Sequence, residues 1–234
     1  MDLVLGSLCL IVPAAAFVAI VVSAVVLTSR ARQRRLQGMA AYAATREWRF
    51  TEDGTGLESR YPGEPFGRGS GRRASNVVDG SYEGRPFLAF DYRYTTGSGD
   101  DRSTSRYSVV AVHLGPLLHP VPRLQVSPQG ALGRFFGNLF GTDHHLGDPG
   151  FDDAFHVRTD SPELARDVLH PDMRLTLSAY QDRAWRLEGD SMLMFKRGEH
   201  SPAEIDAVLA SMHAILSRVP PLVWDRLRGG ETPR

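Results

Sequence analysis

The densest group of potential metal ligands in this chain lies between Asp143 and Asp153. Its inner members are His144, His145, Asp148 and Asp152. Zinc and manganese both accept imidazole nitrogens and carboxylate oxygens, although this spacing matches no recurring zinc-binding pattern. A hydrolase with a metal site in this segment is therefore one hypothesis, and a polar loop without a metal is the simpler interpretation.

The tripeptide Asp143-His144-His145 resembles the motif that names the DHH phosphoesterases. The resemblance covers three residues of 234. The metal site of that family also needs aspartates from separate earlier motifs, and no Asp-x-Asp pattern occurs upstream in this chain. A motif match without its structural context is weak evidence, so we expect no catalytic residue, no metal and no cofactor here.

Residues 67–71 read Gly-Arg-Gly-Ser-Gly and have the composition of a phosphate-binding loop. Such a loop binds phosphate where a strand leads into a helix N-terminus, because backbone N–H groups converge there on the anion. Prolines precede this segment and a strand-like run follows it. It also differs from the Gly-x-Ser-x-Gly elbow of serine hydrolases, because Arg68 stands two residues before Ser70. We interpret it as a flexible turn.

A Phe-rich stripe occupies residues 130–140, where Arg134 is the only charge. The apolar positions, at helical spacing, are Leu132, Phe135, Phe136, Leu139 and Phe140. In a chain tethered to lipid, such a stripe fits a helix that lies in the membrane interface. Packing against the sheet is the commoner role of an apolar stripe, so both interpretations stay open.

The first thirty residues predict a membrane anchor. No charge occurs from Leu3 to Ser29, and a helix needs roughly 20 apolar residues to cross a bilayer. Basic residues then follow at once, namely Arg30, Arg32, Arg34 and Arg35. Positive residues next to a membrane helix stay in the cytoplasm. We therefore expect a single-pass protein of the cell membrane, with its N-terminus outside and its C-terminal domain cytoplasmic.

A cleaved signal peptide and a lipoprotein signal both fit the sequence less well than an anchor does. A cleavable signal peptide has a positive start and an apolar stretch of about 7–15 residues, whereas only Asp2 precedes a longer apolar run here. Cys9 would suit a lipoprotein, but Leu8 occupies the preceding site, where a small residue is required. We expect the anchor to remain uncleaved.

Charge and cysteine content exclude several classes. Residues 47–234 hold 22 basic and 26 acidic residues, and a nucleic-acid-binding domain would instead be basic. The single cysteine permits no disulfide framework and no thiolate metal cluster. The expected partners are the membrane, through the N-terminal helix, and another membrane or cytoplasmic protein, with no nucleic acid.

Alternating apolar residues and turn signals predict several strands after the anchor. The expected strands are residues 74–82, 86–95, 107–114, 124–126, 155–159, 184–188 and 192–196. In the second of them, Leu88 and Phe90 share one face, while Asp91 lies on the other. Gly189-Asp190 suits a type II′ turn between the last two strands.

Two helices have clear start signals. Ser161-Pro162 supplies an N-cap and a proline at the first helical position, which predicts a helix to residue 169. Ser201 and Glu204 form a capping box at the start of a helix over residues 202–218. The single apolar stripe of that helix consists of Ile205, Val208, Leu209, Met212, Ile215, Leu216 and Val219.

These features predict an α+β fold, an antiparallel sheet covered on one face by helices and following an N-terminal transmembrane helix. The order of elements also resembles a pleckstrin-homology-like roll. The expected segments are an anchor (1–29), a basic juxtamembrane helix and connector (30–53), a Gly/Pro-rich loop (54–73), a cytoplasmic α+β domain (74–219) and a disordered tail (220–234).

Four short motifs accompany the anchor and its arginine cluster. They are Pro-Phe-Gly-Arg-Gly-Ser-Gly-Arg-Arg at 65–73, Gly-Arg-Pro-Phe at 84–87, Phe-Asp-Tyr at 90–92 and Val-Leu-His-Pro at 168–171. This layout resembles an uncharacterised family of single-pass membrane-anchored proteins of high-GC Gram-positive bacteria. The resemblance implies membrane attachment and no particular activity. We expect a non-catalytic module that binds a protein or a lipid, with the hydrolase as the alternative.

Overall fold

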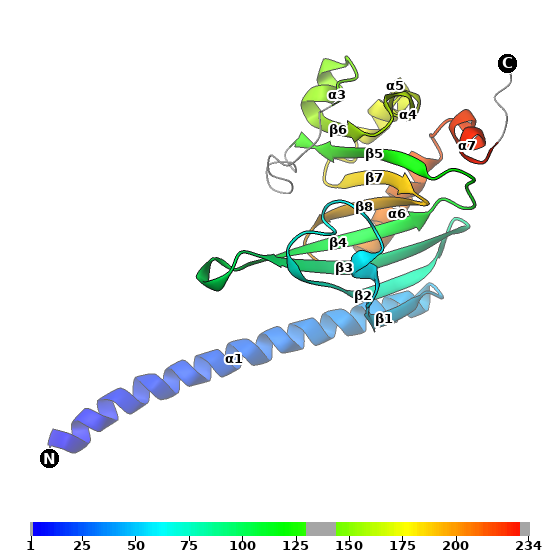
Figure 1. The fold of residues 1–234 in the computed structure, drawn as a ribbon. Coiled ribbons are helices and arrows are strands. Elements are labelled where there is room, and N and C mark those ends of the chain that lie inside the picture. The colour runs from blue at the N-terminus through cyan, green and yellow to red at the C-terminus, as the bar shows by residue number, and fades with distance from the viewer. Residues whose placement is uncertain (1, 130–143, 230–234) are drawn as a thin grey trace.

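A computed structural model describes residues 2–129 and 144–229, with side chains from residue 19 onward. It is an α+β fold built on one eight-stranded sheet in which neighbouring strands are antiparallel, in the order β1-β2-β3-β4-β8-β7-β5-β6 (Figure 1). The strands are β1 (Arg49–Asp53), β2 (Ser70–Tyr82), β3 (Arg85–Thr96), β4 (Ser103–His113), β5 (Val121–Pro128), β6 (Phe155–Thr159), β7 (Ala184–Gly189) and β8 (Ser191–Arg197). The expected α+β class with an antiparallel sheet is confirmed.

The sheet is open, and this corrects the expectation of a roll. Its edges are β1 and β6, which stand at opposite ends of the strand order. A closed roll would require these two edges to approach each other and pair. Instead β7 and β8 insert between β4 and β5 and widen the sheet.

Helices cover one face of the sheet, as expected. They are α1 (Asp2–Thr45), α3 (Pro149–Ala154), α4 (Pro162–Val168), α5 (Pro171–Leu177), α6 (Pro202–Leu216) and α7 (Pro221–Leu227), with the short 3₁₀ turns η1 (Leu57–Ser59) and η2 (Gly99–Asp101) elsewhere. One apolar core joins the helices to alternate residues of the strands. Residues 220–234 were expected to be a tail, but α7 buries Val223 and Trp224 in this core.

Local signals located the best-defined elements correctly. In α6 the N–H of Ser201 donates to Glu204 Oε2 over 3.0 Å, as a capping box requires. Every residue of the predicted apolar stripe of α6, from Ile205 to Val219, is buried. Strand β6 has the expected bounds, and Gly189 has a φ of 64° at the turn before β8.

The second face of the sheet is covered by residues 54–69, which we call the strap. Tyr61 and Phe66 of the strap are buried against aromatic side chains of β3. The ring centroids of Phe66 and Tyr92 lie 4.8 Å apart, and the rings of Tyr61 and Phe90 are stacked. The expected Gly/Pro-rich loop therefore covers the smaller of the two apolar clusters.

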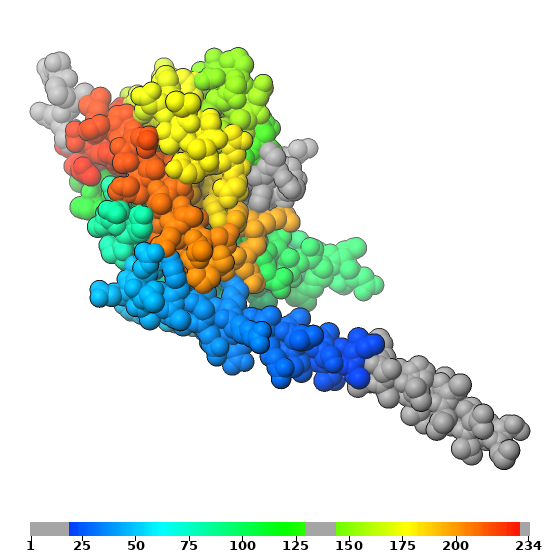
Figure 2. All heavy atoms as spheres, turned by 180° about the vertical axis from the view of Figure 1, so that it is seen from behind, coloured from blue at the N-terminus to red at the C-terminus, as the bar shows by residue number. Residues whose placement is uncertain are grey.

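The ends of β2, β3 and β4 extend past β8 as a projecting hairpin, which we call the finger (residues 70–73 and 93–106). Strand β8 pairs with β4 only as far as Tyr107, so β4 residues before it extend beyond the sheet. The finger and the free part of α1 extend on the same side of the domain (Figure 1), and the view from behind agrees (Figure 2).

Helix α1 runs without a break from Asp2 to Thr45. Residues 30–53 were expected to be a helix and a connector, and the connector contains the edge strand β1. Within the part of the chain whose side chains are described, no single helix is long and apolar enough to cross a membrane, and α6 with α7 reaches that threshold only as a pair bent by 88°.

Candidate functional site

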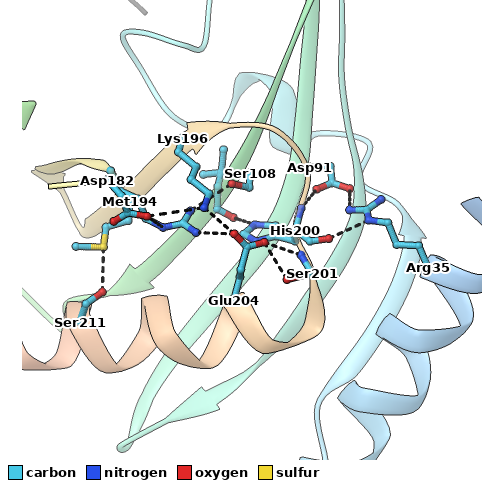
Figure 3. A network of polar contacts seen from close by, with 12 residues as sticks. Arg35, Asp91, Ser108, Asp182, Met194, Lys196, His200, Ser201, Glu204 and Ser211 are labelled. Carbon is cyan, nitrogen blue, oxygen red and sulfur yellow. Dashed lines mark hydrogen bonds and ion pairs between the residues drawn. The ribbon is translucent and has the colours of Figure 1, made fainter. Parts of the chain in front are cut away.

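The junction between α1 and the sheet is built on a partly buried salt bridge (Figure 3). Arg35 Nη2 of α1 lies 2.6 Å from Asp91 Oδ2 of β3. The same guanidinium donates from Nε to the carbonyl oxygen of His200 over 2.9 Å, and Nη1 lies 3.2 Å from Glu199 Oε2. One arginine thus ties the helix to a central strand and to the loop before α6.

Asp91 is buried, and its carboxylate is fully used. Besides Arg35 it accepts hydrogen bonds from Asn76 Nδ2 over 2.8 Å and from the backbone N–H of His200 over 2.9 Å. Asn76 adopts a left-handed conformation with φ 54°, which asparagine tolerates better than most residues. Because a buried charge needs a partner and hydrogen bonds, this carboxylate depends on α1 being in place.

His200 lies behind Asp91 and is 1% exposed. Its Nε2 lies 2.9 Å from the carbonyl oxygen of Val109. Because a carbonyl only accepts, the ring proton is on Nε2, and Nδ1 has no hydrogen-bond partner among the described residues. Burial lowers the pKa of His200, and the nearby Asp91 opposes this shift. The ring is therefore neutral at neutral pH and stabilises the fold.

The last turns of α1 are integrated into the domain. The hydroxyl of Tyr42 and the guanidinium of Arg46 both donate to Asp206 Oδ2 of α6. Burial and the hydrogen bond to Asp206 raise the pKa of Tyr42 to about 12. Met39 and Ala43 are completely buried in the helix-covered core.

A second polar group (Figure 3) borders a cavity of about 260 Å³ that is lined by α6, β8 and the segment before β7. Lys196 Nζ lies 2.6 Å from Glu204 Oε1, and Arg183 Nη2 lies 3.2 Å from the same oxygen. Burial alone would raise the pKa of Glu204, but the hydrogen bonds from Lys196 and Ser201 outweigh it and lower the pKa to about 2. Two cations and the carboxylates of Asp182 and Glu204 balance each other here.

The strap is held by a buried cation, Arg186 of β7, which is 1% exposed. Its guanidinium donates to the carbonyl oxygens of Pro62 over 2.6 Å and of Glu64 over 2.9 Å. A Cβ at Gly63 would lie 2.8 Å from Arg186 Nη1, and Gly63 has a φ of 69°, so both space and conformation require glycine. Burial lowers the pKa of Arg186 to about 10.

The polar groups just described are structural contacts. Each cation just described is paired or hydrogen-bonded, and His200 is closed off from solvent. In the described ranges, no group of three or more His, Cys, Asp or Glu side chains is placed to hold a metal ion. What the geometry provides is a rigid connection between the N-terminal helix and the sheet.

Two of the residues predicted as metal ligands, Asp148 and Asp152, stabilise the loop before β6, and His145 Nδ1 lies 4.0 Å from Asp152 Oδ2. Asp152 accepts the backbone N–H groups of Leu146 and Gly147, each over 3.1 Å. Asp148 caps α3 and forms an ion pair with Arg174 of α5 at 3.2 Å. The two carboxylates therefore have structural partners, and the loop interpretation accounts for them.

The structure places the predicted membrane-facing residues in different surroundings. Arg30, Arg32 and Arg34 are exposed on α1, whereas Arg35 forms the junction with Asp91. The Phe-rich stripe, of which Phe135 and Phe136 are the centre, lies outside the described residues.

The residues of the junction on the sheet side were not predicted as a site. Asp91 stands on the same face of β3 as the buried Ala89. A carboxylate on a face that is otherwise buried was the one sequence signal that could have indicated the junction. His200 precedes the capping box, but nothing in the local sequence shows that β4 would cover it.

By fold class, the molecule is an open antiparallel α+β sheet with helices on one face and a strap on the other. No family model matches the chain, and no curated protein matches it. Among solved structures, its fold is similar to the crystal structure of the mycobacterial trehalose monomycolate transport factor A, TtfA, with a TM-score of 0.56. The two share 14% sequence identity over 80% of this chain and 96% of the other. At this identity the likeness concerns the fold. The similar protein is mycobacterial, which agrees with the high-GC Gram-positive bacteria of the family that the sequence resembles.

Proposed function

We propose that this chain is a non-catalytic accessory factor of a membrane transport system, anchored by α1 and acting through its folded domain. The observation that carries the proposal is the junction of Arg35 with the buried Asp91, because it ties an apolar helix to the sheet domain. The fold likeness to a protein named as a transport factor supports the transport part.

The exposed side of α1 supports attachment to a bilayer. Ile20 is 67% exposed, Val25 61% and Leu27 66%. These residues continue the uncharged run that begins at Leu3. A soluble protein rarely exposes a contiguous apolar surface without a partner, and a bilayer would cover this one. The arginines that follow favour a cytoplasmic domain by the positive-inside rule.

Membrane attachment and orientation can be tested in the bacterium that encodes the chain. The protein should remain in the membrane fraction after an alkaline carbonate wash. Protease added to intact spheroplasts should leave the domain uncut, and should digest it after the membrane is opened. Release by carbonate would contradict the anchor, and digestion in intact spheroplasts would reverse the orientation.

The accessory role can be tested with a matched pair of variants. Arg35 and Arg34 are neighbours of the same type, but only Arg35 contacts the sheet. In a deletion strain with an export defect, Arg34→Gln should restore export and Arg35→Gln should not, although both proteins stay in the membrane. Cross-linking should join a transporter subunit to the wild type and to Arg34→Gln. A deletion strain with normal export of envelope lipids would contradict the proposal.

A further inference from the structure

The finger contains a row of arginines in direct cross-strand register. Arg73 of β2 pairs with Arg93 of β3, and Arg93 pairs with Arg106 of β4. All three are exposed. Arg93 stands two residues after Asp91, so the row lies on the face of the sheet that contacts α1.

This arrangement does not help the domain to fold. Like charges placed directly opposite each other destabilise a sheet. Arg106 is partly compensated, because its Nε lies 3.6 Å from Glu199 Oε1. Arg73 and Arg93 have no ion pair among the described residues. A row of cations in which two have no ion pair among the described residues, and which the fold does not need, points to an anionic partner.

The finger concentrates positive charge in a domain that is otherwise acidic. It holds five arginines and two aspartates, whereas the rest of residues 47–234 holds 17 basic and 24 acidic residues. Arg30, Arg32 and Arg34 are exposed on α1, and the free part of this helix extends on the same side of the domain as the finger (Figure 2). Two basic segments, far apart in sequence, therefore point to the same side.

The lengths of the two segments place the finger near the expected membrane surface. Both start at the contact between Arg35 and Asp91. From Arg35 back to Ser29, where the uncharged run ends, α1 rises by about 9 Å. From Asp91 to Arg93, two residues of extended strand span about 7 Å, and Arg73 and Arg106 pair with Arg93. The arginine row therefore lies about as far from this contact as the end of the uncharged run does.

We propose that the finger docks on the anionic lipid headgroups of the membrane that α1 enters, with Arg73, Arg93 and Arg106 as the binding row. The inference rests on the proposed anchoring and adds a second, reversible contact to it. Together the two contacts restrict the tilt of the domain relative to the membrane. An acidic partner protein is the competing occupant, and the test below separates the two.

The test uses the full chain in lipid nanodiscs. In a Cys9→Ser background, Ser98→Cys carries a fluorophore at the exposed tip, and a quencher is attached to a fraction of the headgroups. Discs contain phosphatidylcholine with or without phosphatidylglycerol. We expect quenching only in discs with phosphatidylglycerol, and its loss at high salt because surface electrostatics are screened.

Two double variants decide whether the row is responsible. Arg73→Gln with Arg93→Gln should lower the docking equilibrium constant roughly 25-fold, at about fivefold per arginine near anionic lipid. Arg166→Gln with Arg218→Gln removes two exposed arginines from α4 and the end of α6, and should leave quenching unchanged. The melting temperature of the finger variant should stay equal or rise, which separates lost docking from unfolding.

The outcomes distinguish failure of this inference from failure of the proposed function. A chain that does not enter discs contradicts the anchor, and the finger proposal falls with it. A chain that enters discs but shows equal quenching with and without phosphatidylglycerol contradicts the finger proposal alone. Cross-linking of the tip to an acidic protein in cells, abolished by the Arg73 and Arg93 changes while quenching is absent, would replace lipid by a protein partner.

Discussion

The two faces of the sheet are covered by different chemistry. The helix-covered face is sealed mainly by apolar side chains, those of the α6 stripe together with the end of α1. The strap-covered face carries aromatic residues, and beside them the buried Arg186 holds the strap through its carbonyl oxygens. An amphipathic helix satisfies its own backbone, so only its side chains must fit the sheet. An irregular strap cannot satisfy its own backbone hydrogen bonds, so its carbonyl groups need a hydrogen-bond donor from the sheet.

This difference explains why one cover is visible in the sequence and the other is not. An apolar stripe at helical spacing is a local pattern, and it predicts which side of α6 is buried. The strap depends on a contact between Arg186 and Pro62, which are 124 residues apart. The faces should therefore respond differently to substitution.

The largest effect is expected on the strap-covered face. Arg186→Met should lower the free energy of unfolding by about 3–5 kcal/mol, because removing one member of a buried charged group leaves its partners unsatisfied. Hydrogen exchange should rise first in residues 54–69. Urea unfolding measures the first quantity and peptide-resolved exchange the second. As a control, Arg68→Gln, at a half-exposed pair with Glu64, should change stability by less than about 0.5 kcal/mol. Unchanged exchange in the strap of Arg186→Met would show that other contacts hold it.

On the helix-covered face, Leu209→Ala should cost about 2–5 kcal/mol, the usual loss for a buried leucine. Leu209 is 1% exposed, whereas Leu175 on α5 is 77% exposed. Leu175→Ala is thus a matched control and should stay within about 0.5 kcal/mol. Equal effects of the two substitutions would contradict the burial of the α6 stripe.

A smaller effect concerns pH at the junction. The pKa of His200 is lowered by burial from its ordinary 6.5, so the unfolded chain binds the proton more readily. Stability from the neutral ring is therefore lost as pH falls through about 6.5, with a slope of at most about 1.4 kcal/mol per pH unit. His200→Gln can still donate to Val109 and should have a flatter profile between pH 7 and 5. Parallel urea-derived profiles for the two proteins would rule out this role for His200.

The smallest effect should have the opposite sign. Arg93→Gln removes the central charge of the finger row and should raise stability by about 0.2–1 kcal/mol, because cross-strand repulsion falls. Thermal unfolding at low and high salt measures it, and the gain should shrink as salt screens the charges. A loss of stability would mean that Arg93 has a structural partner in solution.

Much of the fold was predictable, because its elements carry local signals. The alternation in β3, the turn at Gly189 and the capping box of α6 each rest on neighbours in sequence. Strand β1 was missed because it is short and almost fully exposed, so it shows no clear alternation. Helix α7 was missed because two prolines open it, and its buried Trp224 gives no periodic pattern.

The candidate site was less predictable than the fold. The arginines after the apolar run were singled out from the sequence, which treats them as one group. The structure separates Arg35, whose partner Asp91 lies 56 residues further along the chain, from its exposed neighbours. That partnership depends on where α1 crosses the sheet, and no local pattern contains this information.

Because α1 is an unbroken helix, its length sets the rotation of the sheet domain about the helix axis. Each residue of an α-helix turns by about 100° and rises by 1.5 Å, and the junction at Arg35 fixes the domain to the phase of the helix. A single alanine inserted between Ser29 and Arg30 would rotate the domain by about 100° around the proposed anchor. Seven alanines would restore the phase to within about 20° while adding about 10 Å. If the domain must face a fixed neighbour in the bilayer, export should tolerate the longer insertion better than the shorter one.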